Sequence, residues 1–345
     1  MIFLSQFTQV KFYRKLFFPF VPVYYAVTWL RNKLYDLGFK KSVSFDFPVI
    51  CVGNLSVGGT GKTPMIEYLI ELLKNNYSVA TLSRGYKRKT KGFQLADLNA
   101  TSETIGDEPF QFYSKFKNDI QVAVDSNRVN GVNKLKSLKR SPEIILLDDA
   151  FQHRKVKAGF NILLTTYDSL FIDDFVLPAG NLRESRNGYK RAHIIVITKC
   201  PKDLGETEKN TIVKRINPLD CQRVFFSNIE YSSFVKSDEN KKSLVELDEF
   251  TLVTGIANAQ PLVDFLTSKQ LKFEHLNFKD HYDFSSGDID ELSRKDFIIT
   301  TEKDFMRLQS FSSLKEKLFY LPITVNISES DKFNSLIKEF VSFKM

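Results

Sequence analysis

The stretch CVGNLSVGGTGKTP, residues 51–64, constrains the fold of this chain more than any other part of the sequence. It follows the phosphate-binding pattern G-x-x-x-x-G-K-[ST], except that Ser56 stands where the pattern requires its first glycine. The apolar run at 47–55 is typical of a buried strand, and the apolar spacing at 63–76 predicts a helix. A strand, a glycine loop and a helix in this order are the structural context that a P-loop requires.

This loop predicts how the phosphates of a nucleotide are held. Backbone N–H groups of the loop and the N-terminus of the following helix can bind phosphate oxygens. Lys62 is expected to reach the β- and γ-phosphates of ATP, and Thr63 is expected to bind Mg²⁺. The alternative is a glycine-rich turn without a ligand, and the Lys-Thr pair at the helix start argues against it. The residues expected to bind ATP are Ser56, Val57, Gly58, Gly59, Thr60, Gly61, Lys62 and Thr63.

Apolar runs of strand length recur along most of the chain, between helical patterns. They lie at 78–86, 119–125, 143–149, 160–167, 192–200, 223–231, 249–257 and 296–304. Strands that alternate with helices predict a parallel α/β sheet, whose ligands lie at the carboxyl ends of the strands. We expect an N-terminal helical segment at 1–42, a P-loop kinase domain at 43–155 and a second α/β domain at 156–345, whose last helix can return to the first domain.

Carboxylates and one histidine provide candidate groups for metal binding and proton transfer. Asp148 and Asp149 end the run EIILLDD, and a P-loop enzyme needs such a carboxylate to hold its metal directly or through water. Asp107 in IGDEP and His281 in KDHYDF offer a carboxylate and an imidazole that together could take the proton of a hydroxyl group. From the residues alone, two alternatives stay open: Asp107 can be a helix N-cap, and His281 can be a surface residue.

The N-terminal part has an apolar stripe beside cationic residues. A helix is predicted from Pro22 onward, and the uncharged run at 16–30 is shorter than the roughly 20 residues that a spanning helix needs. No secretory signal is apparent. The pattern suits a helix that lies on a membrane and also one that packs on its own domain. The stripe consists of Val23, Val27, Leu30, Leu34 and Leu37.

Charge and cysteine content narrow the partners only in part. A net charge of +8 suits nucleic acid, an anionic membrane surface or a phosphorylated ligand. The basic residues are spread along the chain without a nucleic-acid-binding motif, so we expect no nucleic acid partner. The three cysteines are far apart and form no CxxC pair, which indicates neither a zinc site nor a disulfide framework.

Eight segments in a fixed order resemble one enzyme family. Between Val52 and Asp304 the chain contains VGNLSVGGTGKTP, SRGY, GDEP, DDAFQHR, LPAGNLRE, GIANAQPLVDFL, DHYDF and TEKD. Together they resemble the tetraacyldisaccharide 4′-kinases of lipid A biosynthesis, whose members commonly lack the first P-loop glycine. The departures are Ala150, where glycine is more usual, and Tyr282, where a second histidine is frequent.

The resemblance implies a reaction, a location and an architecture. Such enzymes transfer the γ-phosphate of ATP to the 4′-hydroxyl of tetraacyldisaccharide 1-phosphate, forming lipid IVA, and they need Mg²⁺. They work at the cytoplasmic face of the bacterial inner membrane, as peripheral or monotopic proteins. The implied fold is a P-loop α/β/α sandwich with a mostly parallel sheet, joined to a smaller α/β domain that closes over the active-site cleft, and an N-terminal helix that engages the bilayer. No obligate protein partner is expected.

The resemblance also implies residue roles. Lys62 and Thr63 match the P-loop lysine and threonine, Asp148 and Asp149 match the metal-binding pair, and Asp107 with His281 match the catalytic base and its partner. Possible cleft contacts are Arg84, Arg128, Arg183, Glu184 and Lys303. Two alternatives remain: a soluble P-loop kinase of a small metabolite, which the N-terminal apolar segment disfavours, and a P-loop nucleotide switch protein, which needs neither the GDEP carboxylate nor a histidine in a second domain.

Overall fold

The computed structural model describes residue 14 and residues 16–280 and 282–345, so His281 lies outside the described residues. The chain divides into two compact units. Unit 1 comprises the residues up to Arg84, Asp119–Asn228 and Val325–Met345, and unit 2 comprises Gly85–Asn118 and Ile229–Thr324. The domain boundaries expected at 42 and 155 do not coincide with this division, because strands on both sides of residue 155 pair within one sheet.

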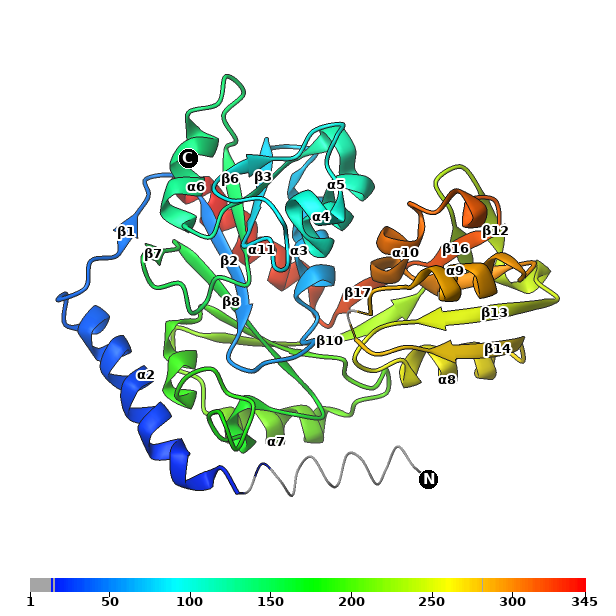
Figure 1. The fold of residues 1–345 in the computed structure, drawn as a ribbon. Coiled ribbons are helices and arrows are strands. Elements are labelled where there is room, and N and C mark those ends of the chain that lie inside the picture. Colours follow the sequence, from blue (N-terminus) through cyan, green and yellow to red (C-terminus); the bar gives the residue numbers. More distant parts are fainter. Residues whose placement is uncertain (1–13, 15, 281) are drawn as a thin grey trace. The chain divides into compact units, whose positions relative to one another are not determined.

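Unit 1 is built on a mostly parallel sheet with the strand order β17-β10-β9-β8-β2-β6-β3-β5 (Figure 1). Its larger elements are α2 (Val21–Asp36), β2 (Val49–Asn54), α3 (Lys62–Leu73), β3 (Val79–Ser83), β5 (Gln121–Val124), α6 (Arg128–Lys136), β6 (Ile144–Asp148), β8 (Phe160–Thr166), β9 (Ile194–Thr198), α7 (Glu206–Ile216), β10 (Arg223–Tyr231), β17 (Ile323–Ile327) and α11 (Ser330–Lys344). A short parallel pair, β1 (Val43–Ser44) and β7 (Val156–Lys157), lies outside this sheet. The expected α/β alternation is confirmed, and β2 lies between β6 and β8.

The core of unit 1 includes a helix from the far end of the sequence. Helix α11 buries Phe333, Ile337 and Val341 completely. The ring of Phe333 meets the ring of Tyr68 on α3 edge to face, with 5.8 Å between their centroids. The last helix therefore packs against the helix that follows the P-loop.

Helix α2 is attached to unit 1 by polar contacts and exposes its apolar side chains. Pro22 lies in its first turn, and Gly38, with φ +80°, follows its end. None of its residues is buried, and Val23 and Val27 are each 63% exposed. Its side chains instead donate hydrogen bonds to the unit, for example from Tyr24 Oη to the Arg183 carbonyl (3.0 Å). An ordinary surface helix packs its apolar face inward, so α2 has the reverse arrangement. Among the described residues, no helix is long and apolar enough to cross a bilayer.

Unit 2 contains a smaller mixed sheet with the order β12-β11-β16-β15-β13-β14. Its elements are β4 (Gln94–Leu95), α4 (Ser102–Ile105), α5 (Asp107–Phe116), β11 (Phe234–Lys236), β12 (Lys241–Ser243), β13 (Glu249–Thr254), α8 (Gln260–Ser268), β14 (Lys272–Asn277), α9 (Ser286–Ser293), β15 (Ile298–Thr301), α10 (Glu302–Leu308) and β16 (Leu318–Leu321). Neighbouring residues such as Leu252 and Val253 contribute to two different core clusters, as the alternation of a strand buried on both faces requires.

Candidate active site

The glycine loop of unit 1 joins β2 to α3 with a backbone that only glycine adopts readily. Gly58 has φ +110° and Gly61, the N-cap of α3, has φ +84°. The buried Thr60 accepts a hydrogen bond from Asn54 Nδ2 (2.8 Å), and its carbonyl accepts one from Thr198 Oγ1 (2.9 Å). The loop is therefore held by the end of β2 on one side and by the end of β9 on the other. The N-terminus of α3 follows the loop at the carboxyl edge of the sheet.

Lys62, the first residue of α3, faces the carboxylate of Asp149, the residue that directly follows β6. Its Nζ lies 3.7 Å from Asp149 Oδ1, and Arg183 Nη1 lies 3.0 Å from the same oxygen. Burial alone would raise the pKa of Asp149, but the charges of Lys62 and Arg183 and the Arg183 hydrogen bonds lower it below its ordinary value. Asp149 is thus an ionised carboxylate beside the P-loop lysine.

Asp148 ends β6 directly opposite β2 and is buried. Val52 is its partner in the parallel ladder, and Ser83 Oγ donates to its Oδ2 (3.2 Å). Arg128 lies behind it and donates from Nη2 to the Asp148 carbonyl (3.2 Å). Burial lowers the pKa of Arg128, although Asp148 and Asp149 act in the opposite direction. Arg84, which follows β3, is exposed.

Glu184 is the centre of a buried hydrogen-bond network in unit 1. Arg191 Nη2 lies 2.7 Å from its Oε1, which also accepts from Gln152 Nε2 (3.0 Å). Its Oε2 accepts from Asn32 Nδ2 on α2 (2.6 Å). The adjacent Arg183 N–H donates to the Leu55 carbonyl (2.7 Å), at the start of the glycine loop. Glu184 therefore links α2 with the segment that supports the loop.

In unit 2, the predicted base Asp107 is ion-paired with an arginine that the sequence analysis did not single out. Asp107 is the first residue of α5, and the N-cap is Gly106, so the N-cap alternative is wrong. Its Oδ2 accepts from Arg307 Nε (3.0 Å) and also from Arg307 Nη2. Burial alone would lower the pKa of Arg307, but the hydrogen bonds and charge of Asp107 raise it.

The TEKD segment supplies the helix that carries this arginine. Asp304 is completely buried and accepts from the Gly255 N–H (2.8 Å) and Thr301 Oγ1 (2.7 Å). Burial raises its pKa despite these hydrogen bonds. Lys303 is ion-paired with Asp280 (3.1 Å). His281 lies outside the described residues, so its pairing with Asp107 stays a prediction.

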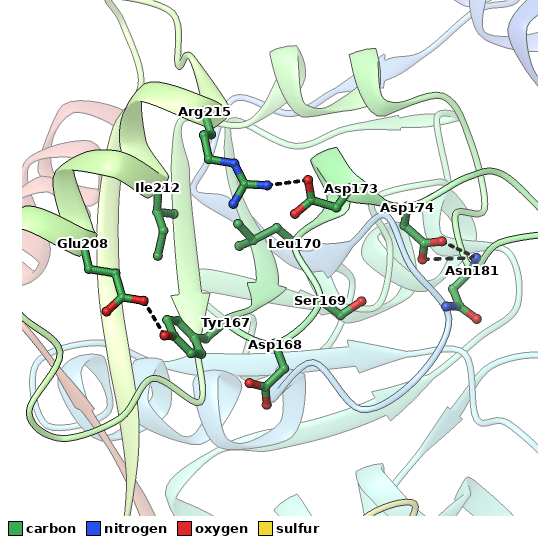
Figure 2. Close-up of a pocket in the computed structure, with 10 residues that line it drawn as sticks. All are labelled: Tyr167, Asp168, Ser169, Leu170, Asp173, Asp174, Asn181, Glu208, Ile212 and Arg215. Carbon is green, nitrogen blue, oxygen red and sulfur yellow. Dashed lines mark hydrogen bonds and ion pairs between the residues drawn. The ribbon is translucent and has the colours of Figure 1, made fainter. Parts of the chain in front are cut away.

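An acidic cavity of about 430 Å³ adjoins the start of the glycine loop (Figure 2). The Asn181 carbonyl at its rim accepts from the Val57 N–H (2.8 Å). Glu208 and Asp173 are engaged with Tyr167 and Arg215. The excess of carboxylates makes this cavity unsuitable for phosphate groups.

The donor set beside the loop fits a divalent cation that is shared with phosphate. Within the described part of the chain, no three His, Cys, Asp or Glu side chains group together as a metal site. Mg²⁺ usually takes only one or two carboxylates and completes its shell with phosphate oxygens and water. Asp148, Asp149 and the Thr63 hydroxyl match that smaller set.

This site combines a glycine-rich loop, a lysine at the start of the following helix, and carboxylates at the end of a neighbouring strand. On a mostly parallel sheet, these features define a P-loop nucleotide-binding protein. The comparisons with known proteins agree and go further. The family model Tetraacyldisaccharide-1-P 4′-kinase matches residues 13–342. The chain belongs to this family, and it is an ATP-dependent phosphotransferase of lipid A biosynthesis.

Individual relatives cover almost the whole chain. A tetraacyldisaccharide 4′-kinase of Flavobacterium johnsoniae is 52% identical over 95% of this chain and 97% of its own length. One of Bacteroides thetaiotaomicron is 46% identical over 95% of this chain and 93% of its own. The "apo" form of LpxK from Aquifex aeolicus, in complex with ATP, is 33% identical, with a TM-score of 0.76 over 95% of this chain and 99% of its own. The predicted family and fold class are thereby confirmed.

Proposed function

We propose that residues 56–63 hold the phosphates of ATP while its γ-phosphoryl group passes to the 4′-hydroxyl of tetraacyldisaccharide 1-phosphate. The observation that carries this proposal is the placement of Lys62, which begins α3 directly after the left-handed Gly61 and faces an ionised Asp149. Loop amides and the lysine ammonium would neutralise charge on the transferring group. Positioning and electrostatics then supply most of the acceleration.

Thr63, Asp148 and Asp149 are the proposed ligands of Mg²⁺. When bound, the ion would neutralise phosphate charge. Asp149 is already held ionised by Lys62 and Arg183, which supports its use as a ligand at neutral pH. Removal of divalent ions with EDTA should abolish transfer, and comparison of Mg²⁺ with Mn²⁺ and Ca²⁺ would establish which ion restores it.

Asp107 is the proposed base that accepts the proton of the 4′-hydroxyl, with His281 as its proposed partner. Arg307 supports this role because its positive charge lies beside the Asp107 carboxylate and its hydrogen bonds fix the orientation of that carboxylate. The proposed cleft contacts are Arg84, Arg128, Arg183, Glu184 and Lys303. Of these, Arg183 and Glu184 act through the hydrogen bonds that hold Asp149 and α2.

We also propose that α2 places the enzyme on the cytoplasmic face of the inner membrane, where its lipid substrate lies. The support is the outward apolar face of a helix whose inward contacts are polar. Exposed apolar side chains in such numbers are typical of an interaction surface, and cationic flanks suit an anionic bilayer.

The proposed reaction is tested by transfer of radiolabelled γ-phosphate from ATP to disaccharide 1-phosphate in mixed micelles. Lys62→Ala should lower kcat by roughly 10²-fold or more, because one charge-stabilising group is lost. Asp107→Asn should lower kcat by roughly 10²- to 10⁴-fold with little change in ATP affinity. The control Lys332→Ala removes an exposed lysine and should keep wild-type turnover. Wild-type turnover in either site variant would refute the corresponding role.

Membrane association is tested separately by sedimentation with anionic vesicles. Replacing Val23 and Val27 with serine should reduce the bound fraction, because both side chains are exposed on α2. The control Val245→Ser removes a still more exposed valine, 88% exposed, from unit 2. Equal binding of the two variants would contradict the proposed role of α2.

A further inference from the structure

A second cavity, of about 370 Å³, lies at the carboxyl-terminal part of α2 in unit 1. Its wall combines the end of α2 with the segment after β5 and the segment that follows β6. The charged side chains that line it are all basic: Arg31, Lys40, Arg154 and Lys155. None of them belongs to the residues assigned to ATP, metal or proton transfer.

Three of these cations surround one aromatic ring. Arg31, Lys40 and Arg154 lie 5.8, 5.9 and 5.3 Å from the centroid of the Tyr35 ring. Interaction with the ring face offsets part of the repulsion among them and keeps them together. Arg154 is also paired with Asp36, 2.8 Å away.

The remaining positive charge is not balanced by protein carboxylates. Arg31, Lys40 and Lys155 form no ion pair with any residue that the structure describes. Clustered cations without counterions repel each other, and an anionic ligand would relieve that repulsion. The cavity therefore suits an anion.

The pKa of His153, which lines the same cavity, is affected by the surrounding positive charges. Burial and the charges of Arg128 and Lys155 lower its pKa to about 4, so the imidazole is neutral at physiological pH. Its Nε2 is buried and has no hydrogen-bond partner among the described residues. Asn127 caps the N-terminus of α6 at the same wall, where the helix dipole adds further positive potential. A phosphate group could use each of these features.

Apolar side chains next to the cavity indicate that the anion is attached to a lipid. Leu37 and Phe39 directly follow α2 and are 60% and 77% exposed. Val23, Val27 and Leu30, earlier on the helix, are likewise more than half exposed. An anion-binding cavity at the end of an exposed apolar surface matches the two parts of a phospholipid, its phosphate and its acyl chains.

We propose that this cavity binds the phosphate of an anionic glycerophospholipid from the bilayer surface. Lys40 and Lys155 offer ammonium donors to the phosphate. Arg31 and Arg154 add positive charge, although Arg31 Nη2 already donates to the Gln152 carbonyl (2.8 Å) and Arg154 donates to the Asn32 carbonyl (3.0 Å) and to Asp36 (2.8 Å). A bound lipid would fix the orientation of α2 on the membrane, beyond what general attraction to the surface provides. The choice of ligand rests on the membrane association proposed above, whereas the site itself takes no part in phosphoryl transfer.

The test uses a water-soluble lipid, so that binding can be measured without a membrane. Dihexanoyl phosphatidylglycerol, below its micelle concentration, is titrated into the full chain by calorimetry, with dihexanoyl phosphatidylcholine as the zwitterionic comparison. The double variant K40Q/K155Q removes two cavity lysines, and the matched control K33Q/K41Q removes two exposed lysines from the same segment outside the cavity. Kinase activity of all proteins is measured in parallel in neutral detergent micelles.

The expected result is saturable binding of the phosphatidylglycerol that weakens roughly thirtyfold in K40Q/K155Q and changes little in K33Q/K41Q. Activity in neutral micelles should be preserved in both, which separates this site from the kinase site. Absence of saturable binding, or equal weakening in the two variants, would overturn the proposal. Competitive displacement by the disaccharide 1-phosphate acceptor would also overturn it, because the cavity would then belong to the substrate. If the wild-type chain showed no kinase activity, that result would count against the proposed function, whereas the outcome of the lipid titration would still stand.

Discussion

The ion pair between Arg307 and Asp107 gives a sharp test of how unit 2 supports the proposed base. Arg307→Gln removes the guanidinium and leaves Asp107, whose side chain is only 19% exposed, without its cationic partner. It also removes a charge 3.7 Å from the completely buried Asp304. Removing one partner of a buried ion pair typically costs about 3–5 kcal/mol, and the partial exposure of Asp107 favours the lower end, about 3 kcal/mol.

Two measurements follow from this loss. The free energy of unfolding in urea should fall by about 3 kcal/mol relative to Arg294→Gln, which removes an exposed arginine from the same unit. The acid limb of the pH–kcat profile should move to higher pH, because the guanidinium no longer favours the ionised carboxylate. The sign is fixed: a lost positive charge makes the base protonate at higher pH.

A double-mutant cycle and a conservative variant guard against a trivial loss of folding. Arg307→Lys keeps the charge and should keep the acid limb near its wild-type position, while it loses the forked hydrogen bonds. Combining Arg307→Gln with Asp107→Asn should destabilise the protein less than the sum of the single changes, by about 1–3 kcal/mol. Additive stabilities together with an unmoved acid limb would refute the coupling between these residues.

Two further predictions concern unit 1. Gly61→Ala should lower stability by about 1–2 kcal/mol and raise the KM for ATP, because an alanine at φ +84° is strained. The control in the denaturation and kinetic assays is Gly205→Ala, since Gly205 has φ −72° and open space around it. Equal effects of the two substitutions would argue against strain in the loop. His153 has a lowered pKa of about 4, so the unfolded chain takes up its proton first, and stability should fall as the pH drops from about 6.5 towards 4. The full shift corresponds to roughly 3 kcal/mol, and solvent screening of the half-buried ring reduces this to about 2 kcal/mol. His153→Gln should flatten this part of the stability–pH curve, and an unchanged curve would show that other groups cause it.

The parts of the fold that come from local patterns were predictable. The apolar run at 47–55 became β2, and the helical spacing at 63–76 became α3, because both follow from burial of neighbouring side chains. The P-loop was recognisable for the same reason: its glycines and lysine are consecutive. The domain boundaries were harder to predict from the sequence. The segment Gly85–Asn118 belongs to the second unit, together with residues that follow it by more than 100 positions.

In the candidate site, too, the sequence did not show which residues contact each other. Lys303 was singled out from the TEKD motif, but Arg307, one helical turn further on, is the residue that contacts Asp107. The spacing i, i+4 placed the two side chains on one face of α10, yet only the packing of α10 against α5 reveals which of them meets the carboxylate. In the same way, the cations of the second cavity come from segments that are separate in sequence, so no local pattern marks them.

The packing of α11 against α3 affects the order in which the protein can fold during synthesis. Phe333 on α11 closes the core over Tyr68, and Tyr68 Oη donates to Asn334 (2.9 Å). The ribosome makes the P-loop early, but the helix that covers α3 emerges only after all of unit 2. Until then the part of α3 around Tyr68 lacks its cover, and the nascent nucleotide-binding unit exposes apolar surface that makes it more prone to aggregation. A frameshift within α11 would therefore uncover part of α3, the helix that begins with Lys62, although α3 lies hundreds of residues upstream.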